Sequence, residues 1–185
     1  MNLKTLFLRY MGKTPDRAER LESYINNFRK MGIKIGKNVD MYGVSIDSLF
    51  PFLVEIGNNC IITGGTKILA HDASLSLFTN QYKVGKVTIY DNVFIGMDTV
   101  IMPGVKIGPN AIIGANSIIT KTVPPNSVVA GAPARHICTL DEFLDKHKPE
   151  TQSKNTEIII VDSSKLNSDQ EVVNFRKYVK NMVNQ

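Results

Sequence analysis

The apolar residues in the middle of the chain recur with a period of six. Isoleucine stands at every sixth position there: Ile89, Ile95, Ile101, Ile107, Ile113 and Ile119. A small or β-branched residue follows each isoleucine four positions later: Val93, Thr99, Val105, Ala111, Ser117 and Val123. A helix repeats about every 3.6 residues and a strand about every two, so neither element alone produces this spacing. Short strands joined by tight turns do, and the pattern predicts a parallel β-helix whose coils bury their isoleucines by stacking.

The same six-residue spacing is present upstream of this region. It includes Ile56, Ile62 and Ile68, with Cys60 and Thr66 at the small positions. The β-helix is expected to begin within residues 33–39, where Ile35 and Gly36 are in register. Residues 41–55 keep the period poorly and include Pro51, so we expect a distorted coil there.

The chain is predicted to leave the β-helix near residue 72. The next small position falls on Asp72, and an aspartate pointing into an apolar interior would be costly. Ile56 and Ile89 are also separated by a number of residues that is not a multiple of six. An excursion within residues 72–87 accounts for both observations. Loops that project from rigid scaffolds often carry functional residues.

Helical segments are predicted on both sides of the β-helix, which we place at residues 33–137. Residues 1–32 form the expected N-terminal helical cap, with Thr14 as N-cap, Pro15 in the first turn and Gly32 at the end. The apolar face of this helix consists of Leu21, Tyr24, Ile25 and Phe28. A helix at this end would cover open strand edges.

The C-terminal part is predicted to contain a short helix within residues 138–149, followed by an extension over 150–185. Thr139 and Glu142 form a capping box for a helix over 140–148. In the extension we expect a strand at 158–161 and a helix that begins with a second capping box, Ser168 and Glu171. The apolar face of that helix consists of Val172, Phe175, Tyr178, Val179 and Met182. The sequence gives this extension no functional interpretation.

Several segments resemble one family of enzymes. They are IGNNCIITGGTKILAHDAS at 56–74, VTIYDNVFIG at 87–96, MPGVKIGPNAIIGANSIITKTVPPNSVVAGAPAR at 102–135, TLDEF at 139–143 and the weaker IKIGKNV at 33–39. These segments resemble the hexapeptide-repeat acyltransferases, above all the maltose and galactoside O-acetyltransferases and their capsule or lipopolysaccharide relatives. The resemblance implies a mainly β fold: a left-handed parallel β-helix with an N-terminal helical cap and a C-terminal helical extension. It also implies a homotrimer and acetyl-CoA as acyl donor.

His71 is the candidate catalytic residue. It is the only histidine of the repeat region, and it lies where the chain leaves the coil. An imidazole, with an ordinary pKa of about 6.5, can accept the proton of a hydroxyl group near neutral pH. The resemblance implies that His71 is the general base, so that the acceptor hydroxyl attacks the thioester carbonyl directly. The alternative is a histidine that only satisfies the hydrogen bonds of a turn.

The resemblance also implies positions for the acyl donor. Three hexapeptides make one coil, so Met97, Ala115 and Pro133 are expected to stack in one column. In the family such a column faces a neighbouring subunit and lies beside the pantetheine arm of coenzyme A, where the Met97 N–H would match the oxyanion donor. Met97 is bulkier than the small residue of the galactoside and maltose enzymes. The alternative for these three positions is an ordinary turn role.

Three other residues match the nucleotide end of the donor site: Thr120, Lys121 and Arg135. Basic side chains meet the phosphates of coenzyme A there. Within the excursion, Asn80, Tyr82 and Lys83 are candidates for acceptor contacts. Solvated surface side chains are the alternative for both groups.

Composition narrows the function classes. The 185 residues are 43% hydrophobic and 21% charged, which is ordinary for a soluble protein. Near the N-terminus only residues 6–8 form an apolar run, too short for a signal peptide or a membrane span, so we expect a cytoplasmic protein. The net charge of +5 is dispersed, without the aromatic and basic interleaving of nucleic-acid binders, and suits a polyanionic small ligand. Cys60 and Cys138 lack metal-ligand spacing and are expected to be reduced thiols.

The sequence therefore indicates an acetyl-CoA-dependent O-acetyltransferase whose small-molecule acceptor is a sugar or nucleotide-sugar. A zinc site like that of β-helical carbonic anhydrases would need several converging histidines, so no metal is expected. A non-catalytic trimeric scaffold stays open, as does an antibiotic or serine acetyltransferase on the same framework. The acceptor hydroxyl, the acyl group and the role of residues 150–185 are not determined by the sequence.

Overall fold

The computed structural model describes residues 17–148 together with residues 173, 174, 176 and 177, which are helical. Ile25–Thr151 form one compact unit, and Met1–Tyr24 with Gln152–Gln185 form a second. Some predictions lie outside the described residues: the N-cap at Thr14 with Pro15, the strand at 158–161, the capping box at 168–171 and the face formed by Val172, Phe175, Tyr178, Val179 and Met182. No helix of the described part is long and apolar enough to cross a membrane.

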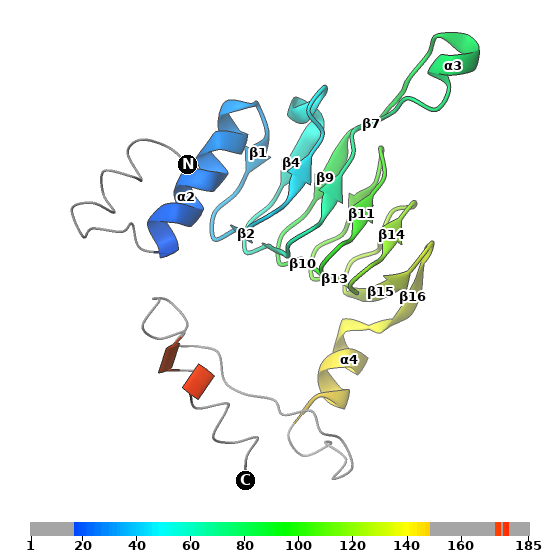
Figure 1. The fold of residues 1–185 in the computed structure, drawn as a ribbon. Helices are drawn as coiled ribbons and strands as arrows, with labels where there is room; N and C mark the ends of the chain where they lie inside the picture. The colour runs from blue at the N-terminus through cyan, green and yellow to red at the C-terminus, as the bar shows by residue number, and fades with distance from the viewer. Residues whose placement is uncertain (1–16, 149–172, 175, 178–185) are drawn as a thin grey trace, which may run out of the picture. The chain divides into compact units, whose positions relative to one another are not determined.

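The chain winds in successive coils, and the aligned strands of these coils form three parallel sheets that are the walls of a β-helix (Figure 1). The first sheet contains β1 (Lys34–Ile35), β4 (Val54–Ile56), β9 (Val87–Ile89) and β12 (Lys106–Ile107). The second contains β2 (Asp40–Met41), β5 (Ile61–Ile62), β10 (Phe94–Ile95), β13 (Ile112–Ile113) and β15 (Ser127–Gly131), with β16 (Ala134–Thr139) at its edge. The third contains β3 (Ser45–Ile46), β6 (Lys67–Ile68), β11 (Val100–Ile101) and β14 (Ile118–Ile119).

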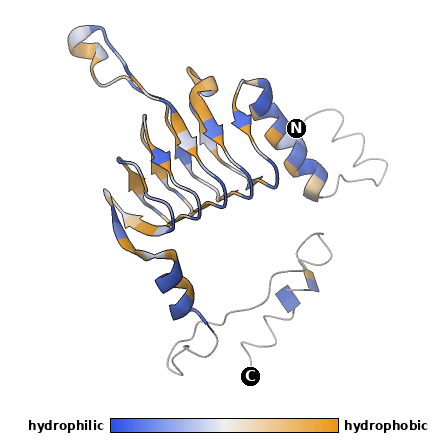
Figure 2. Ribbon diagram, turned by 180° about the vertical axis from the view of Figure 1, so that it is seen from behind, coloured by the Kyte–Doolittle hydropathy of each residue, from blue (hydrophilic) through white to orange (hydrophobic). Residues whose placement is uncertain are grey.

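The six-residue period is explained by what each position does in a coil. The isoleucines of the register point inward, and Ile95, Ile101, Ile107 and Ile113 are completely buried. At the small positions, Thr66, Thr99 and Ser117 are also buried, and each hydroxyl donates to the carbonyl of the residue three positions earlier. A buried hydroxyl satisfied in this way carries no unpaired polar atom into the core. Figure 2 shows how apolar positions recur from coil to coil.

One corner of the β-helix is lined by a ladder of asparagines: Asn38, Asn59, Asn92, Asn110 and Asn126. All five have positive φ angles, between 53° and 58°, which asparagine tolerates better than most residues. Each side-chain amide donates to the next one along, at 2.9–3.1 Å. Close approach of the coils also explains the glycine after several isoleucines, because a Cβ on Gly96 would clash with the backbone of Ala115 in the next coil.

The first coil is covered by helix α2 (Arg17–Lys30) from its C-terminal half. The helix ends at Lys30. Gly32 follows with φ +92°, and the N–H groups of Gly32 and Ile33 donate to the carbonyls of Arg29 and Phe28. Ile25 is buried, and the Arg29 guanidinium donates to the carbonyls of Ile35 and Gly36. Ile35 ends the first strand of its sheet and Gly36 directly follows it, so the cap satisfies an edge that would otherwise be open.

At the other end, helix α4 (Leu140–Lys146) begins with the predicted capping box, in which Thr139 and Glu142 bond reciprocally. The predicted column of Met97, Ala115 and Pro133 is wrong in its last member. From Ile119 to Val123 the chain takes four residues instead of six, so Val123 lies beside Ile107 rather than at a small position. The register is therefore displaced by two, and Gly131, not Pro133, follows Ala115 along the edge. Pro133 lies in the turn between β15 and β16, after a cis peptide bond.

Residues 41–55 are more regular than expected. Met41 and Ile46 take the isoleucine positions and pair with Ile62 and Ile68 of the next coil. The coil is one residue short between Met41 and Ile46, and its larger distortion lies at the corner that follows β3, where residues 48–53 form an inserted turn ending in the 3₁₀ helix η1 (Pro51–Leu53).

The excursion leaves the next coil at the same corner. Strands β7 (His71–Asp72) and β8 (Lys83–Val84) form an antiparallel hairpin, with helix α3 (Ser76–Thr79) at its tip. The hairpin projects away from the coils (Figure 1). Two successive coils are thus interrupted on one edge.

Candidate active site

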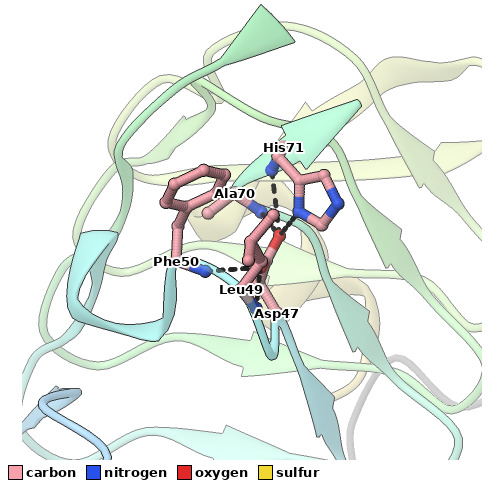
Figure 3. Close-up of polar contacts among 5 residues, drawn as sticks. All are labelled: Asp47, Leu49, Phe50, Ala70 and His71. Atoms are coloured by element: carbon pink, nitrogen blue, oxygen red, sulfur yellow. Dashed lines mark hydrogen bonds and ion pairs between the residues drawn. The ribbon is translucent and has the colours of Figure 1, made fainter. Parts of the chain in front are cut away.

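The inserted turn after β3 and the hairpin of β7 and β8 bring two side chains together, Asp47 and His71. Nδ1 of His71 lies 2.5 Å from Oδ2 of Asp47 (Figure 3). Asp47 directly follows β3 in one coil, and His71 opens β7 in the next. The side chain of Asp47 is fully buried, whereas 27% of the His71 side chain is exposed. Asp47 therefore belongs to the protein interior, whereas the side chain of His71 is partly exposed to solvent.

The Asp47 carboxylate is held by hydrogen bonds from four backbone N–H groups as well as from the imidazole. Oδ1 accepts from Leu49 and Phe50, and Oδ2 accepts from Ala70 and His71. Burial is the largest single influence on the pKa of Asp47 and raises it. The hydrogen bonds from Phe50, Ala70, the His71 ring and Leu49 together outweigh burial and lower that pKa. The carboxylate is therefore ionised at neutral pH.

An ionised Asp47 fixes the tautomer of His71. Because a carboxylate can only accept, Nδ1 carries the proton and Nε2 is left with a free electron pair. Figure 3 shows Nε2 pointing away from Asp47. This arrangement supplies a proton acceptor at Nε2 and a negative charge that stabilises the imidazolium formed when Nε2 takes a proton.

Two aromatic rings flank the imidazole. Phe50, from the inserted turn, contacts it edge-on with ring centroids 5.6 Å apart. Tyr82, from the excursion, lies against it at 5.9 Å with the planes inclined by 32°. Of the candidate acceptor contacts, the structure thus brings Tyr82 to His71.

The other two candidates of the excursion lie elsewhere on the hairpin. Asn80 ends α3 in the left-handed conformation, with φ +57°. The ammonium of Lys83 is already bound, to Asp72 at 3.0 Å and to the hydroxyl of Ser74 at 3.3 Å. Lys83 therefore ties the two strands of the hairpin together at its base.

The candidate donor residues divide into two groups. Thr120, Lys121 and Arg135 line one hollow of about 370 Å³ near the C-terminal end of the β-helix, together with His136. This hollow is open and basic, and fits the polyanionic end of a nucleotide cofactor.

Met97 and Ala115 lie on a different edge. They follow β10 and β13, at the corner between the second and third sheets, whereas His71, Thr120 and Lys121 lie at the corner between the third and first. Met97 is 57% exposed, and within the described residues its N–H donates to no other group. One chain therefore does not place the Met97 edge beside His71.

Asp47 is the candidate site residue that sequence reasoning missed. A signal was present, because strict counting from Ile35 places Met41 and then Asp47 at isoleucine positions. A charged residue at a position reserved for a buried apolar one indicates either a break in the register or a special role. Both are true here.

Two other candidates for chemistry are a metal site and the thiol of Cys60. The described residues include no cluster of three or more histidine, cysteine or acidic side chains that could hold a metal ion. Cys60 is buried, its thiol donates to the carbonyl of Tyr90, and burial raises its pKa. A buried thiol with a raised pKa is a poor nucleophile.

Comparisons with known proteins agree with this architecture. The bacterial transferase hexapeptide family (six repeats) matches residues 86–121. YvoF of Bacillus subtilis (strain 168) is 38% identical over 65% of this chain and 68% of its own length. The protein CapG of Staphylococcus aureus is 35% identical, over 78% of this chain and 83% of its own. The galactoside O-acetyltransferase of Escherichia coli (strain K12) is 34% identical, over 78% and 80%.

Solved structures share the fold. A hexapeptide-repeat-containing acetyltransferase from Vibrio cholerae superimposes with a TM-score of 0.50 and 23% identity, over 65% of this chain and 81% of that one. The fold is the left-handed parallel β-helix. From the repeats and these relatives together, the chain belongs to the hexapeptide-repeat transferases and is an acyltransferase.

Proposed function

We propose that this protein transfers an acetyl group from acetyl-CoA to a hydroxyl of a sugar or glycan precursor, with His71 as the general base. The observation that carries the proposal is the Asp47–His71 pair, which leaves Nε2 free at the foot of a projecting loop. A relative that shares most of its length with this chain is a galactoside O-acetyltransferase. A Vibrio cholerae structure of the same fold is a complex with acetyl coenzyme A.

The geometry supports direct transfer. Nε2 of His71 takes the proton of the acceptor hydroxyl, and the oxygen forms the ester bond as the thioester C–S bond breaks. The departing sulfur then takes the proton from Nε2, which returns the imidazole to its starting tautomer. The buried Asp47 carboxylate stabilises the imidazolium between these two steps. The N–H of Met97, which donates to no group among the described residues, is the candidate donor to the carbonyl oxygen as it becomes negative.

This assignment requires more than one copy of the chain, because His71 and Met97 lie on different edges. We propose a homotrimer in which the Met97 edge of one subunit faces the His71 edge of the next. An exposed apolar row adjoins the Met97 edge: Ile61 and Phe94 on the second sheet and Ile118 on the third. Burial of such a row between subunits would stabilise the assembly. We place the reaction in the cytoplasm, where acetyl-CoA is available.

Thr120, Lys121 and Arg135 are proposed to hold the phosphates of coenzyme A, since their hollow is basic and open. Ala115 would lie beside the pantetheine arm with Met97. Pro133 does not belong to this column, because the strand register is displaced by two residues before β15.

The test is free-thiol release from acetyl-CoA against a panel of sugars, nucleotide-sugars, serine and chloramphenicol. We expect turnover with a sugar or nucleotide-sugar, reduced by orders of magnitude in His71→Ala. Turnover restricted to serine or chloramphenicol would overturn the acceptor class, and full activity of His71→Ala would overturn the base. A protein without acetyl-CoA binding would be a scaffold instead.

A further inference from the structure

The rings around His71 form a continuous aromatic series. Phe52 packs edge-on against Phe50 at 6.2 Å, Phe50 contacts His71, and His71 contacts Tyr82. Nδ1 of His71 is hydrogen-bonded to Asp47, and Phe50 is half-buried beside the imidazole. Nε2 of the imidazole and the rings of Phe52 and Tyr82 are therefore open to solvent. Of these two rings, only Tyr82 contacts the imidazole directly.

Tyr82 is 51% exposed although its ring is held in a defined place. A half-exposed aromatic ring inclined by only 32° to the imidazole presents an apolar face next to the proton acceptor. Small-molecule sites combine such apolar surfaces with few polar groups that fix orientation. A pyranose ring fits this environment, since its C–H face is apolar and its hydroxyls point outward from the rim.

The position of Tyr82 is maintained by the base of the hairpin. His71 pairs with Val84 and Asp72 with Lys83, so Tyr82 directly precedes the paired strand. Hydrogen bonds from the Ser74 backbone and from Lys83 lower the pKa of Asp72 to about 2, so the carboxylate that holds Lys83 is charged at any physiological pH.

We infer that Tyr82 is the specificity-determining residue of the acceptor site, and that its ring is the surface on which a pyranose lies while one of its hydroxyls reaches Nε2 of His71. This inference rests on the proposed function. Lys83 is then a positioning residue that acts through Tyr82 rather than a contact of the acceptor.

The experiment measures kcat and KM separately for a sugar acceptor and for acetyl-CoA, in the full chain. Tyr82→Ala is expected to raise the acceptor KM by about tenfold, the loss expected for one stacked ring with its buried area, while the KM for acetyl-CoA stays unchanged. Tyr82→Phe keeps the ring and should stay within about threefold of wild type. Phe78→Ala is the matched control, because it removes an 81% exposed ring from the same loop without any ring contact to His71.

The position of Lys83 supplies a second readout. Lys83→Ala should raise the acceptor KM in the same direction, and Lys83→Arg should restore it, because arginine can still pair with Asp72. An unchanged acceptor KM in Tyr82→Ala, or an equal loss in Tyr82→Phe, would overturn the inference while leaving the proposed function intact. A wild-type enzyme that acetylates no sugar would overturn the proposed acceptor and this inference together.

Discussion

Replacing Asp47 by asparagine tests the role of the buried carboxylate most directly. The change keeps the shape of the side chain and removes its charge. In wild type, two backbone N–H groups donate to each carboxylate oxygen, and the imidazole donates to one of them. An amide has only one accepting oxygen, so two backbone N–H groups lose their acceptor in either orientation of the amide.

The expected effects follow from this count. Two donors left without acceptors cost about 1–3 kcal/mol each, so the free energy of unfolding should fall by about 2–6 kcal/mol. The imidazolium also loses its counter-charge. In one orientation the amide donates to Nδ1 of His71 and moves the proton to Nε2, where it blocks the base. We therefore expect kcat to fall by about 10²–10⁴-fold with little change in the KM for acetyl-CoA.

The assay combines thiol-release kinetics with urea unfolding at several pH values. Because the pKa of Asp47 is lower in the folded protein than in the unfolded chain, its carboxylate stabilises the fold above about pH 4. This contribution is lost as the pH falls through the folded pKa, so the stability difference between wild type and Asp47→Asn should shrink in acid. Glu55→Gln is the control, since it neutralises an ion-paired carboxylate on a sheet surface. Wild-type kcat in Asp47→Asn would refute the role given to the pair.

Three further predictions concern the scaffold, the assembly and the donor site. Asn92→Ala should lower the free energy of unfolding by about 1–3 kcal/mol in urea titrations, because it breaks two rungs of the ladder and places alanine at φ +58°, whereas Asn92→Gly should lose less. Phe94→Asp should give monomers in analytical ultracentrifugation and abolish acetyl-CoA binding by calorimetry; monomers with micromolar affinity would contradict the shared site. Lys121→Ala and Arg135→Ala should each weaken acetyl-CoA binding about tenfold, and an equal loss with an acyl donor lacking the nucleotide would contradict the phosphate contacts.

The regular part of the fold is predictable because one physical rule repeats along the chain. Each coil has an inward apolar position and a small corner position, so Ile95 and Thr99 predict the burial of their counterparts in neighbouring coils. The capping box at Thr139 is equally local, and its outcome depends on four residues. His71 is a candidate for the opposite reason, since it lies where the regular repeat ends.

The displaced register could not be predicted in the same way. A corner can lose two residues, as between Ile119 and Val123, without a mark in the hydrophobic pattern, because Val123 suits an inward position as well as a small one. The neighbours of Pro133 then depend on pairing between strands sixteen residues apart instead of eighteen. Sequence spacing alone assumes that every corner has the same length.

The position of Asp47 shows how the site depends on such irregularities. Met41 and Ile46 are one residue closer than the period requires, and this shift moves Asp47 from the inward position to the corner. There the inserted turn supplies the N–H groups of Leu49 and Phe50, and the departing strand of the next coil supplies those of Ala70 and His71. In the regular coils the strand N–H groups donate to carbonyls of the neighbouring coil instead, so they are not available to a side chain. The N–H groups that hold the Asp47 carboxylate beside His71 therefore come from the places where two consecutive coils break the repeat at the same edge.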